Sequence, residues 1–360
     1  MKTKLYLLKK ILPALICIPV FVGCQGDEPM EKQENVTPTS GVLILNQGTW
    51  GKNNSSLSYY DFVSGETVDD VMNGRLGDTA QDIIVYGGKV YVSITMSGVI
   101  WVLSADDLKE LKKIEISSYN DLLREPNYLA AYSGKVYATA NSGHLIEIDT
   151  ASLEIDAMTD IGANPEGIAV ANGKIYAGNT NGYALPFDST LSVVNIFPLQ
   201  EEKRIKVGVN PNRIRPDDNG NLYISYRGNY GYYEPFAAGG FIKLNVADNT
   251  LKEIDIPANQ DFTIINDTLY YFGVTYNDDW TTNNFFGRYD IISETQINDE
   301  WVNPNDITTP YALGIDPHNK DIYIADTDYV TSGRILVFDR NGKQKIEFFA
   351  GLNPCKFVFK

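Results

Sequence analysis

The chain has 360 residues with 46 acidic and 30 basic side chains, which gives a formal net charge of −16 at pH 7. Nucleic acids and anionic lipid surfaces both require basic patches on a protein, so a chain this acidic is not expected to bind either of them. The sequence holds 3 cysteines and 2 histidines, and His144 and His318 lie in different parts of the chain, so a His/Cys zinc cluster is not expected.

Residues 1–23 are predicted to be a signal peptide. A lysine-rich start is followed by an apolar run at residues 11–22, which is too short to span a membrane. The run ends in the tetrapeptide FVGC at residues 21–24, which resembles the box of bacterial lipoproteins and implies lipidation of Cys24. An ordinary cleaved signal with a chance cysteine is the alternative. Removal of residues 1–23 takes away four lysines and changes the net charge from −16 to −20.

Residues 24–40 are expected to form a flexible acidic tether, because they are polar, charged and contain proline. Asp27 and Glu28 follow Cys24 closely, and this arrangement resembles the surface-export signal of Bacteroidota lipoproteins. The resemblance implies an outer-membrane protein that is held by its lipid and exposed on the cell surface. Only Cys355 then remains in the folded part, so no disulfide framework is possible there.

Residues 41–360 are predicted to form one all-β domain built from repeats. Residues 164–180 read NPEGIAVANGKIYAGNT, with an Asn-Gly turn between two alternating runs, which is a strong hairpin signal. The tyrosine of the second run recurs with steps of 46, 39, 47, 47 and 53 residues, at Tyr91, Tyr137, Tyr176, Tyr223, Tyr270 and Tyr323. Strand-only repeats of about 40–50 residues are typical of β-propeller blades. The segment 106–113 (DDLKELKK) is interpreted as a turn that connects strands.

Seven inner strands can be counted, which predicts a seven-bladed propeller. They are expected at residues 82–88, 127–134, 166–173, 212–220, 261–268, 311–319 and 355–360. The chain opens at residue 41 with a run that matches a second strand, and it ends with an inner strand that nothing follows. The two ends are therefore predicted to complete one blade, with residues 355–359 pairing beside residues 42–46. Such closure removes exposed strand edges.

Loops between second and third strands are expected to share one face with the Asn-Pro corners. They are minimal at residues 95–98 and 140–143 but long elsewhere, and extra length on a rigid scaffold is typical of binding. The long loops, at 47–56, 178–184, 226–240, 275–287 and 325–333, are rich in aromatic residues and asparagine. Side chains of these kinds dominate binding surfaces. The residues expected to bind a ligand are Trp50, Asn53, Tyr183, Tyr226, Arg227, Tyr230, Tyr232, Tyr233, Tyr276, Trp280, Phe285 and Tyr329. Packing of these rings onto the blades is the alternative.

An enzyme is the less favoured interpretation. Glu166, Asn212 and Asp261 hold comparable positions in successive repeats, and their oxygen atoms would suit calcium, as in gluconolactonase-like hydrolases. Those enzymes have six blades, and two isolated histidines do not support a Ser-His-Asp or Cys-His arrangement. No catalytic residue, metal or cofactor is therefore expected.

The hairpins GKVYV, GKVYA, GKIYA, GNLYI and KDIYI resemble those of the YVTN-type, YncE-like seven-bladed propellers. Together with the lipoprotein box, the tether and the aromatic loops, the chain resembles the BtuG-type surface lipoproteins of Bacteroides. This resemblance implies binding of vitamin B12 (cobalamin or another corrinoid) and delivery to a TonB-dependent transporter of the BtuB type. A broad, amide-edged ligand calls for a wide mouth, flat aromatic walls and many hydrogen-bonding groups. A glycan would need a similar surface, so a glycan-binding or surface-layer propeller stays open as an alternative.

Overall fold

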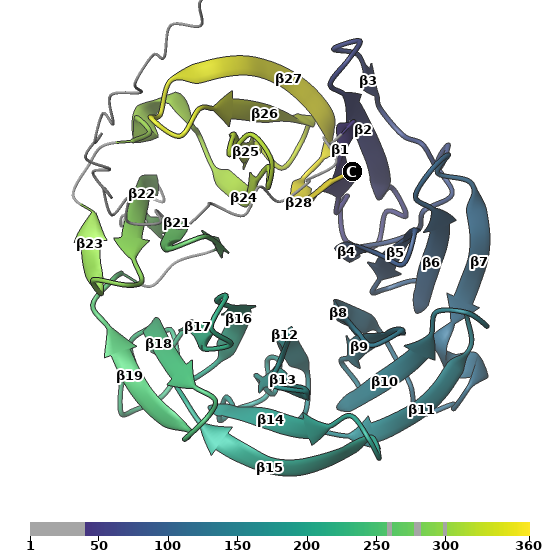
Figure 1. Cartoon of the computed structure of the whole chain (residues 1–360), viewed down its shortest axis with the longest axis vertical. Helices are drawn as coiled ribbons and strands as arrows, with labels where there is room; N and C mark the ends of the chain where they lie inside the picture. Colours follow the sequence, from purple (N-terminus) through teal and green to yellow (C-terminus); the bar gives the residue numbers. More distant parts are fainter. Residues whose placement is uncertain (1–39, 258–260, 277–281, 298–300) are drawn as a thin grey trace, which may run out of the picture. The chain divides into compact units, whose positions relative to one another are not determined.

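A computed structural model of the chain describes residues 40–257, 261–276, 282–297 and 301–360. These residues form seven four-stranded antiparallel sheets that follow one another around a ring (Figure 1). The prediction of an all-β, seven-bladed propeller is therefore confirmed. We number the sheets as blades 1 to 7, beginning with the sheet that contains both ends of the folded chain.

The strands of each blade are given from the inner to the outer edge. Blade 1 consists of β28 (Pro354–Phe359), β1 (Gly41–Asn46), β2 (Ser56–Asp61) and β3 (Thr67–Val68). Blade 2 consists of β4 (Ala80–Tyr86), β5 (Lys89–Ile94), β6 (Val99–Ser104) and β7 (Glu110–Glu115). Blade 3 consists of β8 (Pro126–Tyr132), β9 (Lys135–Ala140), β10 (His144–Asp149) and β11 (Ile155–Asp160). Blades 4 and 5 consist of β12 (Pro165–Ala171), β13 (Lys174–Asn179), β14 (Thr190–Asn195) and β15 (Gln200–Lys206); and β16 (Pro211–Pro216), β17 (Leu222–Tyr226), β18 (Gly240–Asn245) and β19 (Thr250–Ile254). Blades 6 and 7 consist of β20 (Asp261–Ile265), β21 (Thr268–Tyr276), β22 (Thr282–Asp290) and β23 (Thr295–Ile297); and β24 (Pro310–Ile315), β25 (Ile322–Asp326), β26 (Ser332–Phe338) and β27 (Gln344–Leu352).

Two short 3-10 turns, η1 (Ile116–Ser118) and η2 (Pro304–Asp306), lie in connections between blades. Nowhere in the described ranges is there a helix with the length and apolar character that a bilayer span requires. The interpretation of residues 106–113 as a connecting turn is only half right, because β7 begins at Glu110. Lys112 and Lys113 pair with Val102 and Trp101 of β6, so ladder pairing decides the conformation over the local helical pattern.

The ring is closed by β28, which pairs with β1. The register joins Val42 to Phe359, Leu43 to Val358 and Ile44 to Phe357, as the unmatched ends of the sequence predict. Beyond the ladder, the main-chain N–H groups of Gln47 and Gly48 donate to carbonyls of Asn353 and Leu352 at 2.9 and 3.0 Å. The closing blade therefore brings together residues more than 300 positions apart.

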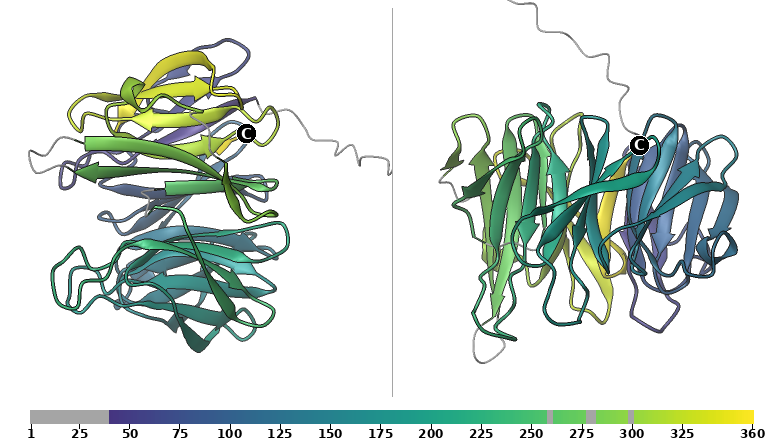
Figure 2. Two further views of the ribbon diagram at one scale, coloured as in Figure 1. Left: turned by 90° about the vertical axis from the view of Figure 1, so that its left-hand side faces the viewer. Right: turned by 90° about the horizontal axis from the view of Figure 1, so that it is seen from below.

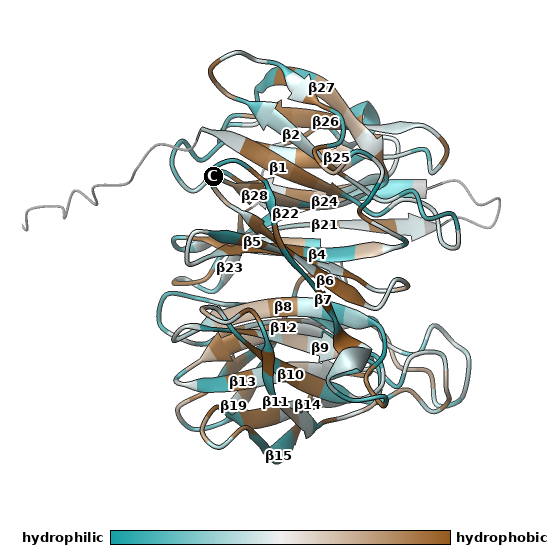
Figure 3. Cartoon of the chain, turned by 90° about the vertical axis from the view of Figure 1, so that its right-hand side faces the viewer, coloured by the Kyte–Doolittle hydropathy of each residue, from teal (hydrophilic) through white to brown (hydrophobic). Residues whose placement is uncertain are grey.

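The recurring tyrosines fill the interfaces between blades. Tyr91, Tyr137 and Tyr223 are fully buried, and Tyr176, Tyr270 and Tyr323 nearly so. Tyr91 of blade 2, for example, packs with Leu129 and Val136 of blade 3. Figure 3 shows hydrophobic residues along the strands and hydrophilic residues in the connecting loops. The tyrosine that recurs in the sequence therefore makes the same kind of core contact in one blade after another.

One face of the ring holds both the loops between second and third strands and the connections that precede the inner strands, and we call it the mouth face. The two kinds of segment are joined directly, since Thr95, Asn181, Arg227 and Thr327 donate their N–H groups to carbonyls just before the inner strand of the same blade. The strands run between this face and the opposite one (Figure 2). Inner strands begin at the mouth face and line the central channel.

Candidate functional site

The two loops that depart most from a simple turn belong to neighbouring blades. The segment 180–189 joins β13 to β14 in blade 4, and the segment 227–239 joins β17 to β18 in blade 5. Asn210, which lies just before β16, connects them: its N–H donates to the Asp188 carbonyl at 2.7 Å, and its carbonyl accepts from the Arg227 N–H at 3.0 Å. The two loops are therefore held next to each other on the mouth face.

The 227–239 loop is shaped by one buried side chain. The Asn229 Oδ1 atom accepts from the N–H groups of Gly231 and Ala237 at 3.1 and 3.0 Å. Its Nδ2 group donates to the carbonyls of Tyr233 and Pro235 at 2.8 and 2.9 Å. Gly228 has φ +73°, and a Cβ atom there would lie 2.2 Å from the Ala237 carbonyl oxygen, so only glycine fits. The loop is thus fixed by its own hydrogen bonds.

Four aromatic rings from the two loops meet, and we call them the aromatic cluster: Phe187, Tyr230, Tyr232 and Tyr233. The centroid of the buried Phe187 ring lies 6.1–6.2 Å from the centroids of the three tyrosines, and Tyr230 lies 5.9 Å from Tyr232. Tyr230 and Tyr232 remain 55% and 65% exposed, and Tyr183 of the 180–189 loop is 94% exposed. A buried ring therefore supports tyrosines whose faces stay open to solvent.

Arg227 lies at the base of this loop and binds a carboxylate of blade 4. Its Nη1 group donates to the Glu166 Oε1 atom at 2.8 Å. Burial alone would lower the pKa of Arg227, but the Glu166 carboxylate outweighs burial and holds the pKa above its ordinary value. Burial also raises the pKa of Tyr230, which keeps the phenol neutral. The base of the site is consequently an ion pair without net charge beside the neutral phenol of Tyr230.

Beside the Arg227–Glu166 pair, polar side chains cross the central channel, and we call them the channel belt: Gln81, Tyr128, Arg213, Arg215 and Asp261. The Tyr128 hydroxyl oxygen accepts from Gln81 Nε2 at 2.7 Å and from Arg213 Nη1 at 2.5 Å. Arg213 Nε lies 3.4 Å and Arg215 Nη2 3.7 Å from Asp261 Oδ1. The belt joins the inner strands of blades 2, 3, 5 and 6.

The remaining predicted residues on the mouth face divide into separate groups. The Tyr329 ring meets the Tyr311 ring edge-on, with their centroids 5.8 Å apart. The Tyr311 hydroxyl group donates to the Gln47 side chain. These three residues belong to blades 7 and 1. Trp50 and Asn53 lie exposed in the loop that follows β1. These residues are in blades other than those of the aromatic cluster, so the mouth face carries its rings in two places.

Two predicted residues pack within blades instead of facing the mouth. The Tyr226 ring lies over Gly208 and Gly240, and its hydroxyl group donates to Glu253 on the outer strand β19 at 3.0 Å. Phe285 lies over Gly273 and contacts the Tyr271 ring. The expected loop at 275–287 is largely strand, because β21 extends to Tyr276 and β22 begins at Thr282. The Tyr276 side chain, Trp280 and Cys24 lie outside what the structure describes.

With this geometry established, comparison of sequences identifies the family. The sequence profile of the family described as "Domain of unknown function (DUF5074)" matches residues 40–348. The chain belongs to the DUF5074 family. No curated protein is significantly similar in sequence to this DUF5074 chain.

Solved structures share the fold of the DUF5074 propeller at low identity. A protein assigned provisionally as a 6-phosphogluconolactonase, from Bacteroides fragilis, matches with 14% identity and a TM-score of 0.63, over 89% of this chain and 98% of that chain. A functionally unknown protein from Desulfotomaculum acetoxidans matches with 11% identity and a TM-score of 0.64, over 89% and 99%. Hydrazine synthase of Kuenenia stuttgartiensis matches with 13% identity and a TM-score of 0.56, over 70% and 74%. At such identities the likeness concerns the fold.

The three residues that would suit calcium in a lactonase are engaged by protein groups in this DUF5074 propeller. Glu166 binds Arg227, and Asp261 lies beside Arg213 and Arg215. The Asn212 Oδ1 atom accepts from the Ser225 hydroxyl at 2.8 Å. The described ranges contain no group of three or more His, Cys, Asp or Glu side chains that could hold a metal ion. Arginine side chains therefore occupy the surroundings that a calcium ion would need.

Sequence reasoning identified Asp261 but missed the other residues of the channel belt of the DUF5074 propeller. Tyr128 and Arg213 are 85 positions apart and belong to blades that are not neighbours, so no local pattern links them. One signal was present: residues 212–216 read NRIRP, with two arginines in a strand where apolar residues are expected. Charged residues in an inner strand indicate side chains that meet in the channel.

Proposed function

We propose that the mouth face captures a large, nearly neutral, amide-rich ligand, and that this ligand is cobalamin or a related corrinoid. One observation carries the proposal: two loops of adjacent blades bring the aromatic cluster together and leave Tyr230 and Tyr232 more than half exposed. Exposed rings that fold stability does not require are typical of binding surfaces.

The cluster is organised before a ligand arrives. Asn229 fixes the 227–239 loop, and Asn210 fixes the distance between that loop and segment 180–189. Binding to such a surface orders few side chains, so less of the contact energy is lost to entropy. The Arg227–Glu166 pair offers polar atoms without a net charge, which suits the amide edge of a corrin ring better than it suits a strongly charged ligand.

The rest of the proposal follows from the sequence. A signal peptide at residues 1–23, lipid on Cys24 and a tether over residues 24–40 would place the propeller on the outer surface of an outer membrane. A TonB-dependent transporter of the BtuB type would then receive the ligand from the mouth face. We propose a binding role and no catalysis.

Calorimetry with cyanocobalamin on the purified full chain tests the proposal. Tyr230→Ala and Tyr232→Ala should each weaken binding about thirtyfold, because loss of an aromatic anchor costs about 2 kcal/mol. Phe197→Ala is the matched control, since this ring is fully exposed in the turn between β14 and β15, away from the mouth face. No heat with the wild-type chain would remove cobalamin as the ligand. Tight binding that both tyrosine variants retain would leave cobalamin but place it elsewhere.

A glycan is the second candidate, because sugar rings also stack on exposed tyrosines and Tyr183 and Tyr232 are both open to solvent. Binding of soluble polysaccharides in place of cyanocobalamin, with the same dependence on Tyr232, would favour it.

A further inference from the structure

The central channel contains a pocket of about 300 Å³, which lies deeper than the aromatic cluster. Its walls come from the inner strands β4, β8, β12, β16 and β28 of five blades. A volume of this size is at the lower end for small-molecule sites. The pocket is therefore too small for a corrinoid and is a separate feature from the site proposed above.

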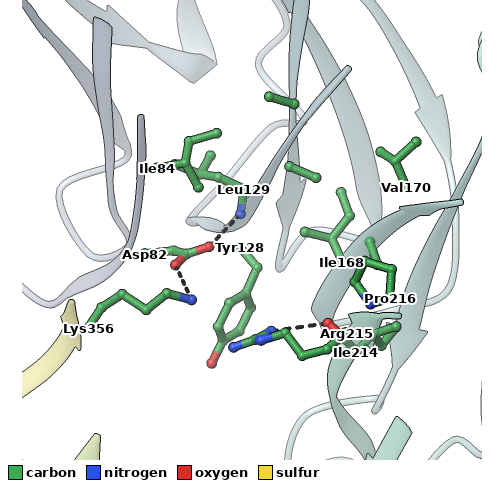
Figure 4. A pocket seen from close by; sticks show the side chains of 13 residues that line it. Asp82, Ile84, Tyr128, Leu129, Ile168, Val170, Ile214, Arg215, Pro216 and Lys356 are labelled. Atoms are coloured by element: carbon green, nitrogen blue, oxygen red, sulfur yellow. Dashed lines mark hydrogen bonds and ion pairs between the residues drawn. The ribbon is translucent and has the colours of Figure 1, made fainter. Parts of the chain in front are cut away.

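The pocket has a polar end and an apolar end. The polar groups of Asp82, Tyr128, Arg215 and Lys356 gather on one side, and aliphatic side chains such as Ile84, Ile168 and Val170 line the other (Figure 4). Because inner strands begin at the mouth face, Asp82 and Tyr128 lie nearer to it than Ile84 and Val170. An occupant would place a polar head toward the mouth face and an apolar body toward the opposite face.

The polar end has donors to spare. The Asp82 Oδ2 atom accepts from the Leu129 N–H at 2.9 Å, whereas Oδ1 lies 3.1 Å from Lys356 Nζ in an ion pair and accepts no hydrogen bond. The Tyr128 oxygen already accepts two hydrogen bonds, from Gln81 and Arg213, so its own hydrogen is left to donate. Burial raises the pKa of Tyr128 and keeps that hydrogen in place. The Tyr128 hydroxyl group, together with Arg215 and Lys356, therefore favours an occupant that supplies acceptors.

The charges in the channel also favour an occupant that supplies hydrogen-bond acceptors. Ion pairs link four cations, Arg213, Arg215, Arg227 and Lys356, to three carboxylates, Asp82, Glu166 and Asp261. The other polar groups described beside them, including the phenol of Tyr311 and the thiol of Cys355, are neutral because burial raises the pKa of both. This half-buried network therefore has one positive charge in excess, within a chain whose net charge is −16. A buried charge requires a partner.

The geometry points to a second binding site, for a small monocarboxylate with an apolar body. The carboxylate would accept from Arg215, Lys356 and the Tyr128 hydroxyl group, and the apolar body would lie along Ile84, Ile168 and Val170. One excess positive charge matches a carboxylate better than a dianionic phosphate, and the aliphatic wall excludes a sugar. The site does not depend on the corrinoid proposal.

Calorimetry on the purified full chain tests this site with 3-phenylpropionate and 3-methylbutanoate as probes, and with 3-phenyl-1-propanol as the uncharged analogue. Both acids should bind in a saturable manner, and the alcohol at least tenfold more weakly than 3-phenylpropionate. Arg215→Gln should weaken binding of the acids at least tenfold, because a charge-assisted hydrogen bond is lost. Arg340→Gln is the matched control, since it removes the same charge from an exposed turn between β26 and β27.

Ala130→Leu provides an independent variant, because it narrows the pocket without removing a charge. It should weaken 3-phenylpropionate more than the smaller 3-methylbutanoate, and it serves the test even if Arg215→Gln fails to fold. The inference is overturned if neither acid binds at millimolar concentration, if acid and alcohol bind equally, or if both pocket variants bind like wild type.

Discussion

Deletion of residues 353–360 should abolish the cooperative fold, because these residues close the ring. The deletion removes β28 and leaves β1 as an unpaired edge, although Val42, Leu43, Ile44 and Leu45 are fully buried in the intact domain. An exposed apolar edge of this kind pairs readily with other chains. The truncated chain is therefore expected to aggregate.

The magnitude follows from the hydrogen bonds and the aromatic ring that the deletion removes. The β1–β28 ladder joins five pairs of residues, and an antiparallel ladder has about one backbone hydrogen bond for each pair. At about 1 kcal/mol for each hydrogen bond, the loss is about 5 kcal/mol. Phe357 is buried against Gly314 and Tyr323, and removal of such a ring costs about 3–5 kcal/mol. The sum of about 8–10 kcal/mol is comparable to the whole stability of a typical domain, about 5–15 kcal/mol.

Denaturant unfolding followed by circular dichroism measures the effect. Phe357→Ala should keep the fold but lower the free energy of unfolding by about 3–5 kcal/mol. Phe349→Ala, a largely exposed ring on β27, is the matched control and should change it by less than about 0.5 kcal/mol. A truncated chain that unfolds with the wild-type midpoint and slope would refute the closure argument.

Three further outcomes are expected. Cys24→Ala should release the protein from membranes without a change in its melting curve, and fractionation that finds the variant still membrane-bound would reveal another anchor. Cyanocobalamin binding should survive EDTA, whereas loss of binding, or calcium bound at Glu166 and Asn212, would favour a lactonase-like enzyme. Burial raises the pKa of Cys355 to about 12, so the native thiol should react with a disulfide reagent only as the protein unfolds. Because the folded pKa is the higher one, the contribution of Cys355 to stability should be intact below about pH 9 and should fall as the pH rises toward 12, in melts compared with Cys355→Ala.

The fold was predictable because each blade repeats the same local signals. The tyrosine of each second strand is a core residue, so its spacing in the sequence reports the spacing of blades in the ring. The closing pair was predictable for a different reason: a second strand without an inner strand at one end of the chain and an inner strand without successors at the other can satisfy only each other. Both inferences depend on hydrogen-bonding requirements that a sequence displays directly.

The candidate site was predictable only in part. Aromatic content identified the 227–239 loop, but it did not distinguish Tyr226, which packs over Gly208 and Gly240, from Tyr230, which joins the aromatic cluster. Tyr226 is the last residue of β17 and is paired with Gly240, so the strand fixes the direction of its ring. Phe285 is placed by a ladder in the same way. A side chain belongs to the mouth face only beyond the point where pairing ends, and sequence alone left that point uncertain by several residues.

The hydrogen bond between Arg213 and Tyr128 has a consequence for how the ring opens. In repeat architectures each unit contacts its neighbours, and parts of the molecule can unfold one unit at a time. This bond instead joins blade 5 to blade 3 and passes over blade 4, while Glu166 of blade 4 and Asp261 of blade 6 lie beside the same arginine. Displacement of any one of these four blades would take a partner away from a buried guanidinium. Blades 3 to 6 should therefore exchange their amide hydrogens as a single unit, and the seven-fold repeat of the sequence should not appear as a seven-fold repeat in the dynamics.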